Sequence, residues 1–149
     1  LGDRKPLDML ELAIDSLERM GIDPTLLEAS GDLELGFVIE GDATLLGRAL
    51  TNLLRNAQTH GEGLTTLSLR AMKESVRIEV SDQGPGLPAE HLERLSSPFT
   101  QGSTTRSGSL GLGLFLARRI GHAHGGTLQA QPGDPAGVTL VLELPRRDL

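Results

Sequence analysis

Three short stretches of this chain carry residue types and spacings that could do chemistry. The first covers residues 81–86, Ser-Asp-Gln-Gly-Pro-Gly, and follows residues 76–80, whose alternating apolar and charged side chains are typical of a β-strand. That strand would fix the Asp82 carboxylate at its end, while Gly84 and Gly86 would let a ligand or another backbone approach closely. The same residues also form an ordinary turn, so this stretch alone leaves both interpretations open.

The second stretch contains two asparagines, Asn52 and Asn56, which share one face of an expected helix because they are four residues apart. Asparagine is unfavourable inside a helix, since its amide competes for backbone hydrogen bonds. An amide oxygen is a suitable ligand for a hard cation such as Mg2+. Two solvated side chains would give the same spacing, so the pair indicates a metal site without establishing one.

The third stretch, residues 108–113, joins a polar segment to an apolar helix. Residues 96–109 are rich in Ser, Thr and Gly, and this run is too long for an ordinary connection, which indicates a functional or mobile loop. Glycine is unfavourable in the first turn of a helix. Bare N–H groups at that end, however, would stabilise a bound phosphate by roughly 1–2 kcal/mol.

The composition predicts a single globular domain. The chain has 149 residues, of which 38% are hydrophobic and 23% charged. A net charge of -6 argues against a nucleic-acid partner, and the absence of Cys excludes a disulfide framework. No apolar run approaches the ~18 residues that a membrane helix needs, so we expect no direct membrane contact from this segment.

Apolar periodicity predicts the elements that would position these stretches. Helices are expected at 6–20, from an N-cap at Asp42 to about 60–61, at 88–95, and from Leu110 to a stop at 125–126. Strands are expected at 25–28, 36–39, 64–71, 75–81, 127–131 and 138–144, with the last two joined by a turn at 132–137. His122, His124 and the arginines at 118–119 and 146–147 are expected to be solvated.

In their order along the chain, these stretches resemble the ATP-binding catalytic domain of bacterial sensor histidine kinases. The resemblance rests on Asn-Leu-Leu-Arg-Asn-Ala at 52–57, Asp-x-Gly-x-Gly at 82–86, Pro-Phe at 98–99, Gly-x-x-Gly-Leu-Gly-Leu at 108–114 and His-Gly-Gly at 124–126. It implies an α/β fold, the Bergerat or GHKL fold shared with gyrase, Hsp90 and MutL. This fold is a two-layer sandwich in which helices pack on one face of a mixed, largely antiparallel sheet. Residues 1–149 would form one domain, with 1–5 left from an upstream linker and a mobile ATP lid at about 96–110.

The resemblance also implies a role for each site residue. Asn56 takes the Mg2+-ligand position, Asn52 lies near the phosphates, and Asp82 accepts a hydrogen bond from the adenine amino group. The other implied nucleotide contacts are Gly84 and Gly86 beside the base, His60, Phe99 as the lid anchor, Gly108, the backbone amides of Gly111, Leu112 and Gly113 at the phosphates, and Thr139 near an adenine water network. Arg106 is the main candidate for a catalytic cation.

This chain departs from the family pattern at one of these positions and at two positions near them. Many sensor kinases carry Lys or Arg where this chain has Thr59, Tyr where it has His60, and Arg where it has Gln101. Two phosphate-facing cations are therefore expected to be missing, so that ATP affinity or lid closure would be weaker than is typical.

The implied function is that of a protein-histidine kinase in two-component signalling. The chain would bind Mg·ATP and donate the γ-phosphoryl group to a histidine on a separate dimerisation domain of the same sensor kinase, with a response regulator as an indirect partner. None of His60, His91, His122 and His124 lies in a phosphoacceptor box, so the acceptor is expected outside this chain. The parent protein is expected to be anchored in the inner membrane, with this domain in the cytoplasm.

Two other functions stay open at this stage. In related ATPases and in serine kinases of anti-sigma type, a Glu general base stands where this chain has Asn52, and a neutral amide cannot accept the proton. Negligible intrinsic hydrolysis is therefore expected. His-Gly-Glu at 60–62 favours a Ser/Thr kinase of anti-sigma type. Thr59 and Gln101 favour a degenerate nucleotide-sensing docking module.

Overall fold

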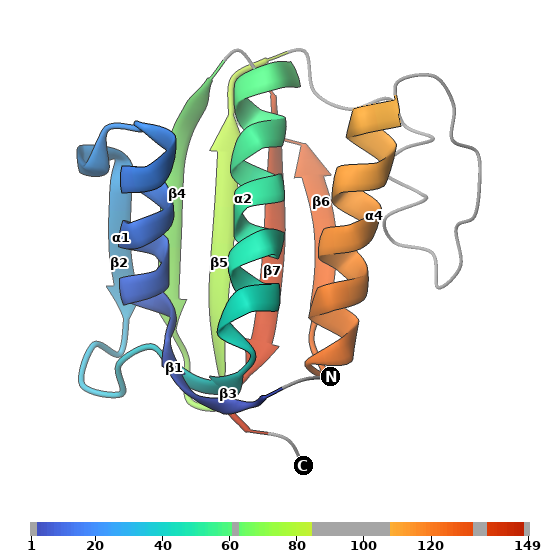
Figure 1. Cartoon of the computed structure of the whole chain (residues 1–149). Coiled ribbons are helices and arrows are strands. Elements are labelled where there is room, and N and C mark those ends of the chain that lie inside the picture. The colour runs from blue at the N-terminus through green and yellow to red at the C-terminus, as the bar shows by residue number, and fades with distance from the viewer. Residues whose placement is uncertain (1–2, 61–62, 85–107, 133–136, 148–149) are drawn as a thin grey trace.

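Helices cover one face of a β-sheet in the computed structural model, which describes residues 3–60, 63–84, 108–132 and 137–147. The long helices are α1 (Met9–Met20), α2 (Ala43–His60) and α4 (Gly108–Ala123), and Figure 1 shows them on the same side of the sheet. This arrangement confirms the expected two-layer α/β sandwich. Among the described residues, none of the helices combines the length and the apolar character needed to cross a lipid bilayer.

The main sheet of the described residues has five strands in the order β2-β4-β5-β7-β6. β2 pairs with β4 in parallel and all other neighbours pair antiparallel, so the mixed, largely antiparallel sheet is confirmed. Its strands are β2 (Leu27–Gly31), β4 (Leu64–Ala71), β5 (Ser75–Asp82), β6 (Thr127–Pro132) and β7 (Val138–Pro145). A separate two-stranded sheet pairs β1 (Lys5–Asp8) with β3 (Val38–Gly41).

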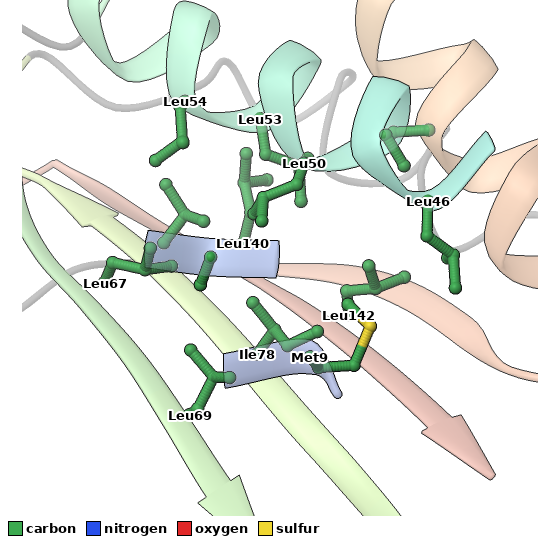
Figure 2. Close-up of a cluster of buried hydrophobic side chains, with 14 of the residues drawn as sticks. Met9, Leu46, Leu50, Leu53, Leu54, Leu67, Leu69, Ile78, Leu140 and Leu142 are labelled. Carbon is green, nitrogen blue, oxygen red and sulfur yellow. The ribbon is translucent and has the colours of Figure 1, made fainter. Parts of the chain in front are cut away.

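The core lies between α2 and the middle of the sheet. Figure 2 shows the leucines of α2 pointing toward side chains of β4, β5 and β7, and all of these side chains are almost fully buried. Burial of branched aliphatic side chains is the main stabilising contribution in such a layer. The labelled members are Met9 of α1, Leu46, Leu50, Leu53 and Leu54 of α2, Leu67 and Leu69 of β4, Ile78 of β5, and Leu140 and Leu142 of β7.

Strand β5 turns every second side chain toward the helices. Val76, Ile78, Val80 and Asp82 are buried, and the residues between them are half-buried. Because Ile78 lies in the core beneath α2 (Figure 2), this buried series faces the helix layer. Asp82, the last residue of the strand, therefore continues the core-facing series but carries a carboxylate.

Helix α1 begins later than the sequence predicts. Residues 5–8 form β1, and Asp8 is the N-cap, whose Oδ1 accepts a hydrogen bond from the Leu10 N–H at 2.9 Å. The predicted start at residue 6 was wrong because pairing with β3 gives the preceding backbone its own partners. The buried face of α1 consists of Met9, Ala13, Ser16 and Leu17, and Ile14 is 39% exposed.

The short elements that follow α1 also differ from the prediction. The expected strand at 25–28 begins as the 3-10 turn η1 (Pro24–Leu26), capped by the Asp23 side chain, and β2 occupies Leu27–Gly31. The expected strand at 36–39 is shifted to Val38–Gly41. Short segments of this kind take their bounds from pairing partners far along the chain, here β4 for β2 and β1 for β3.

Two side chains that were expected to be solvated hold element ends together instead. His124 is 3% exposed; its Nε2 accepts a hydrogen bond from the Asp42 N–H at 3.0 Å and its Nδ1–H donates to the Ile120 carbonyl at 2.9 Å. Arg146 donates to the carbonyls of Met72, Val38 and Gly36 at 2.9, 3.2 and 2.8 Å. The prediction was wrong because the partners are distant in sequence. Arg118 is also buried, at 5% exposure, whereas Arg119 is exposed as expected.

Candidate functional site

The predicted site stretches meet at one end of the sandwich. In Figure 1 the C-terminal ends of α2 and β5 and the first residues of α4 and β7 all lie at the top. Antiparallel pairing of β5 with β7 brings the end of one strand beside the start of the other. This end therefore gathers Asn52, Asn56, Asp82 and the N-terminus of α4 from segments far apart in the sequence.

Asp82 is a buried carboxylate fixed by backbone donors. It is 3% exposed, and its Oδ1 accepts a hydrogen bond from the N–H of Gly84 at 2.9 Å. The Val138 N–H at the start of β7 also donates to this carboxylate. Burial raises the pKa of the Asp82 carboxyl above its ordinary value, and the two backbone hydrogen bonds partly oppose this shift. A carboxylate has about four acceptor positions, so it can still accept a hydrogen bond from a ligand.

Thr139 lies on the sheet face opposite to the Asp82 carboxylate. In the ladder of β5 and β7 it stands opposite Ser81, and the two hydroxyl oxygens are 3.0 Å apart. Because successive side chains alternate between faces, Ser81 and Thr139 point away from the helices. The structure therefore does not bring the Thr139 hydroxyl to the carboxylate, and its place in an adenine water network stays a prediction. The β7 side chain on the Asp82 face is Val138, which is 3% exposed and has no hydroxyl.

Asn56 presents a buried amide oxygen that the rest of the described chain leaves without a partner. The residue is 7% exposed, and its Oδ1 accepts no hydrogen bond from any described residue. An unpaired buried acceptor costs roughly 1–3 kcal/mol, so such an atom is best explained by a bound ion or water. Since a hard cation prefers oxygen ligands, the donor atom fits the predicted Mg2+ site.

The described residues offer no alternative metal site built from charged or imidazole side chains. No group of three or more His, Cys, Asp or Glu side chains able to hold a metal occurs among them. A cation at Asn56 would therefore need most of its ligands from a bound molecule and from water, which is how Mg2+ is commonly held beside phosphates.

Asn52 connects α2 with α4. Its Nδ2 donates a hydrogen bond to the Gly113 carbonyl at 3.3 Å, and a Cβ on Gly113 would lie 4.0 Å from the Asn52 Cβ. This contact places the N-terminal half of α4 beside the helix face that carries both asparagines. Figure 1 shows the two helices side by side over the sheet.

Helix α4 begins at Gly108, which is earlier than the predicted start at Leu110. The N–H groups of the first three residues of a helix have no acceptor within it, and in α4 these are residues 108–110. Gly108 is therefore among the available amides. The predicted phosphate donors Gly111, Leu112 and Gly113 come later in the helix, and their contact with a phosphate stays a prediction.

Two arginines that the sequence analysis did not consider flank Asn52 on α2. Arg48, Asn52 and Arg55 all line a groove of about 720 Å³ between α1 and α2. Neither arginine has an ion-pair or hydrogen-bond partner within the described part of the chain. Their spacing of four and three residues from Asn52 is the signal that could have identified them, because it places all three side chains on one helix face.

Several predicted site residues fall outside the described residues. These are Gly86, Phe99 and Arg106, the lid over 96–107, the expected helix at 88–95, and the side chain of His60. Gly84 is described and is buried directly behind the Asp82 carboxylate.

Gly137 is the residue near Asp82 that sequence reasoning missed. It was expected only as the end of a turn, but its backbone lies against the backbone and side chain of Asp82 with φ +83°. No local pattern signals this contact, since the partner is on a different strand. The β5–β7 register, which a single sequence does not display, is what brings the two residues together.

Comparison with known proteins gives one family and a consistent set of relatives. The family model for histidine kinase-, DNA gyrase B-, and HSP90-like ATPases matches residues 41–148. Sensor protein CutS of Streptomyces coelicolor is 32% identical over 151 residues, which cover 96% of this chain and 36% of that protein. The chain thus spans about a third of the length of this curated relative.

Solved structures agree with this family over the whole chain. The nucleotide-free catalytic domain of histidine kinase ThkA superposes with a TM-score of 0.75 at 26% identity, covering 99% of each chain. A second structure, of ThkA in complex with the response regulator protein TrrA, matches with a TM-score of 0.68 at 26% identity, covering 96% of this chain and 42% of the other.

Proposed function

The chain belongs to the family of histidine kinase-, DNA gyrase B- and HSP90-like ATPases, and from this membership we propose that it binds Mg·ATP and donates the γ-phosphoryl group to a histidine elsewhere in a sensor kinase. The resemblance to the ATP-binding catalytic domains of such kinases is confirmed by the relatives. Residues 1–149 would act as a single catalytic domain on the cytoplasmic side, within a longer parent protein. The observation that carries the proposal is the buried, core-facing carboxylate of Asp82 at the same end of the sandwich as the unpaired Asn56 oxygen.

Asp82 would recognise the adenine base. Its two backbone hydrogen bonds hold the carboxylate in one orientation, and a remaining lone pair would accept the N–H of the exocyclic amino group. A hydrogen bond to a charged acceptor contributes about 1.5–3 kcal/mol, which is about 10- to 100-fold in affinity. Guanine has a carbonyl at the corresponding position and would place two acceptors against each other, so the carboxylate would also supply base specificity.

Asn56 would bind the metal through the oxygen that has no protein partner. Asn56 would hold Mg2+ through that oxygen, and the cation would supply positive charge against the negative charge that develops during phosphoryl transfer. The buried position of Asn56 on α2 fixes the direction of its amide, and the neighbouring leucines of the helix hold α2 against the sheet. The residue therefore positions the ligand without any movement of the core.

Backbone amides and arginines would hold the phosphates. The free N–H groups at residues 108–110 and the positive end of the α4 dipole lie at the site end of the molecule. Arg48 and Arg55 lie beside Asn52 in the groove between α1 and α2, so they would act on the phosphates through their positive electrostatic field rather than by direct contact. Arg106 stays a predicted catalytic cation.

The chemistry would be positioning and charge neutralisation rather than activation of water. An acceptor imidazole nitrogen would form a bond to the γ-phosphorus as the bond to the bridging oxygen breaks and ADP leaves. Asn52 cannot act as a general base, because its amide is neutral and already donates to the Gly113 carbonyl. Phosphoryl transfer to a histidine needs no such base, since a neutral imidazole nitrogen is itself the nucleophile.

The partners would be the dimerisation domain that carries the acceptor histidine and, after it, a response regulator. A response regulator is bound to the related kinase ThkA in its complex with TrrA. Several relatives are named as sensor histidine kinases, so they do not favour the alternative of a Ser/Thr kinase of anti-sigma type. The docking-module alternative has no observation in its support beyond Thr59 and Gln101.

Calorimetry with matched acid-to-amide variants tests the nucleotide site. The wild-type chain should bind ADP in the presence of Mg2+, and Asp82→Asn should weaken binding about 10- to 100-fold. Glu79→Gln, on the same strand but on the other face, should leave affinity unchanged. Equal effects of the two substitutions would mean that Asp82 does not contact the base.

Radiolabel transfer in the full-length parent tests the kinase activity. Label from the γ-phosphate of ATP should reach the protein, be lost on acid treatment as phosphohistidine is, and disappear in Asn56→Ala. Acid-stable label would instead indicate a serine or threonine acceptor.

A further inference from the structure

We propose that Gly137 is a positioning residue for the Asp82 carboxylate, and that its lack of a side chain is what allows the start of β7 to hold that carboxylate in the orientation that recognises the purine. The expected loss of nucleotide affinity without this glycine rests on the proposed function. The expected orientation of the Asp82 carboxylate is independent of that function.

The two residues are in closer contact than any side chain at position 137 would permit. A Cβ built on Gly137 would lie 1.9 Å from the Asp82 carbonyl oxygen, 2.6 Å from its carbonyl carbon and 2.8 Å from its carboxylate Oδ1. Two of these atoms are backbone of β5, which is paired on both sides by β4 and β7 and cannot move aside. Relief of the overlap would therefore move the beginning of β7 away from Asp82.

That movement would break a hydrogen bond that fixes the carboxylate. The N–H of Val138, the next residue, donates to the Asp82 side chain, and the Gly84 N–H donates to Oδ1 from the other side of the strand end at 2.9 Å. With only the Gly84 contact left, the carboxylate could rotate about χ1 and χ2. The Val138 N–H can therefore donate to the carboxylate only while the Gly137 backbone stays in contact with Asp82.

Backbone conformation adds a separate requirement for glycine. Gly137 has φ +83°, a value that residues with a side chain rarely adopt. Other glycines of this chain share that feature without touching Asp82. Gly31 is the best match, because its φ is +86° and a Cβ there would lie 2.2 Å from the Ala71 carbonyl oxygen, at the β2–β4 edge of the sheet.

The pair Gly137→Ala and Gly31→Ala therefore separates positioning from general strain. Both substitutions impose a positive φ on alanine and an overlap with a strand carbonyl, and both should lower the melting temperature. Calorimetric titration with ADP and Mg2+, at a temperature where circular dichroism shows both variants folded, should give an affinity about tenfold or more weaker for Gly137→Ala. Gly31→Ala should bind within about twofold of wild type, as expected for a remote site.

A direct measurement on the wild-type protein covers the case in which Gly137→Ala does not fold. In protein labelled with 15N and 13C, a scalar coupling across the hydrogen bond should connect the Val138 nitrogen with the Asp82 carboxyl carbon. Its absence in the folded protein would overturn the proposal, as would an unchanged ADP affinity in a folded Gly137→Ala or equal losses in the two variants. If the wild-type chain bound no ADP while the coupling was present, the proposed function would fail and the positioning role would stand.

Discussion

Replacement of Asn56 by leucine should make the nucleotide-free protein more stable while it destroys the metal site. The side chain is 7% exposed, and its Oδ1 accepts no hydrogen bond from the described residues. An unsatisfied buried acceptor costs roughly 1–3 kcal/mol, and leucine has the same number of side-chain heavy atoms without that cost. Leucine also has a somewhat higher helix propensity than asparagine, by about 0.3–0.5 kcal/mol.

Asn52→Leu is the matched control, one turn earlier on the same helix, and should have the opposite sign. The Asn52 amide donates to the Gly113 carbonyl at 3.3 Å, so leucine loses a hydrogen bond and leaves that carbonyl with one partner fewer. The loss is about 1 kcal/mol, from which the same gain in helix propensity must be subtracted. The free energy of unfolding should therefore rise by about 1–3 kcal/mol for Asn56→Leu and fall by about 0.5 kcal/mol for Asn52→Leu.

Urea unfolding without nucleotide measures both values, and thermal melting should show a rise of about 2–10 °C for Asn56→Leu. A second series with ADP and Mg2+ should stabilise the wild-type protein by mass action and have little effect on Asn56→Leu. Destabilisation by Asn56→Leu in the nucleotide-free state would show that its oxygen is satisfied after all. Full stabilisation of that variant by ADP with Mg2+ would remove Asn56 from the site.

Three further predictions follow from other contacts. The double substitution of Arg48→Ala and Arg55→Ala should weaken ATP binding and make the affinity depend less on salt concentration, because both groups line the groove at Asn52. Arg70→Ala, on the exposed surface of β4, is the control. Calorimetric titration with ATP at several salt concentrations measures both effects. His124→Ala should lower the free energy of unfolding by about 1–3 kcal/mol, because the N–H of Asp42, the N-cap of α2, loses its acceptor. A smaller loss of the free energy of unfolding, measured in urea, would contradict this role of His124. The raised pKa of Asp82 means that the carboxyl binds its proton more tightly in the folded state than in the unfolded state. The stability that this group contributes is therefore present below the ordinary pKa of 3.8 and is lost as the pH rises through the folded pKa. Urea unfolding from acid to neutral pH should show this fall in the free energy of unfolding for the wild type but not for Asp82→Asn.

The parts of the fold that sequence reasoning predicted well are those set by local periodicity. The Asp42 N-cap is confirmed, with its Oδ1 accepting from the Thr44 and Leu45 N–H groups at 3.0 and 3.1 Å. The alternation of residues 76–80 predicted strand β5, which the structure confirms, and in the structure Asp82 lies on its buried face. Such features depend on neighbours within about four residues, so they can be derived from one sequence.

The errors concern residues whose surroundings come from distant segments. His124 is 82 residues from the Asp42 N–H that it accepts, and Arg146 is 110 residues from the Gly36 carbonyl, so neither burial has a local signature. The face of Thr139 depends on register instead, because a difference of one position along a strand reverses the face on which a side chain lies. A resemblance can align a threonine to a motif, but only the β5–β7 register decides which face carries it.

Helix α2 is held in place by apolar contacts on one face while its other face carries polar side chains near the ligand site. Leu46, Leu50 and Leu53 bury one face of the helix against the sheet, while Asn52 and Asn56 lie on the face toward α4. Because a helix is rigid over this length, the apolar contacts that hold α2 in place also fix the direction of both amides without any ligand. The unpaired oxygen of Asn56 and the buried charge of Asp82 lower the stability of the empty domain, and this cost is recovered when a ligand satisfies them. Such a site should bind with little rearrangement of the sheet, and its affinity should depend on preorganised backbone contacts such as the one at Gly137.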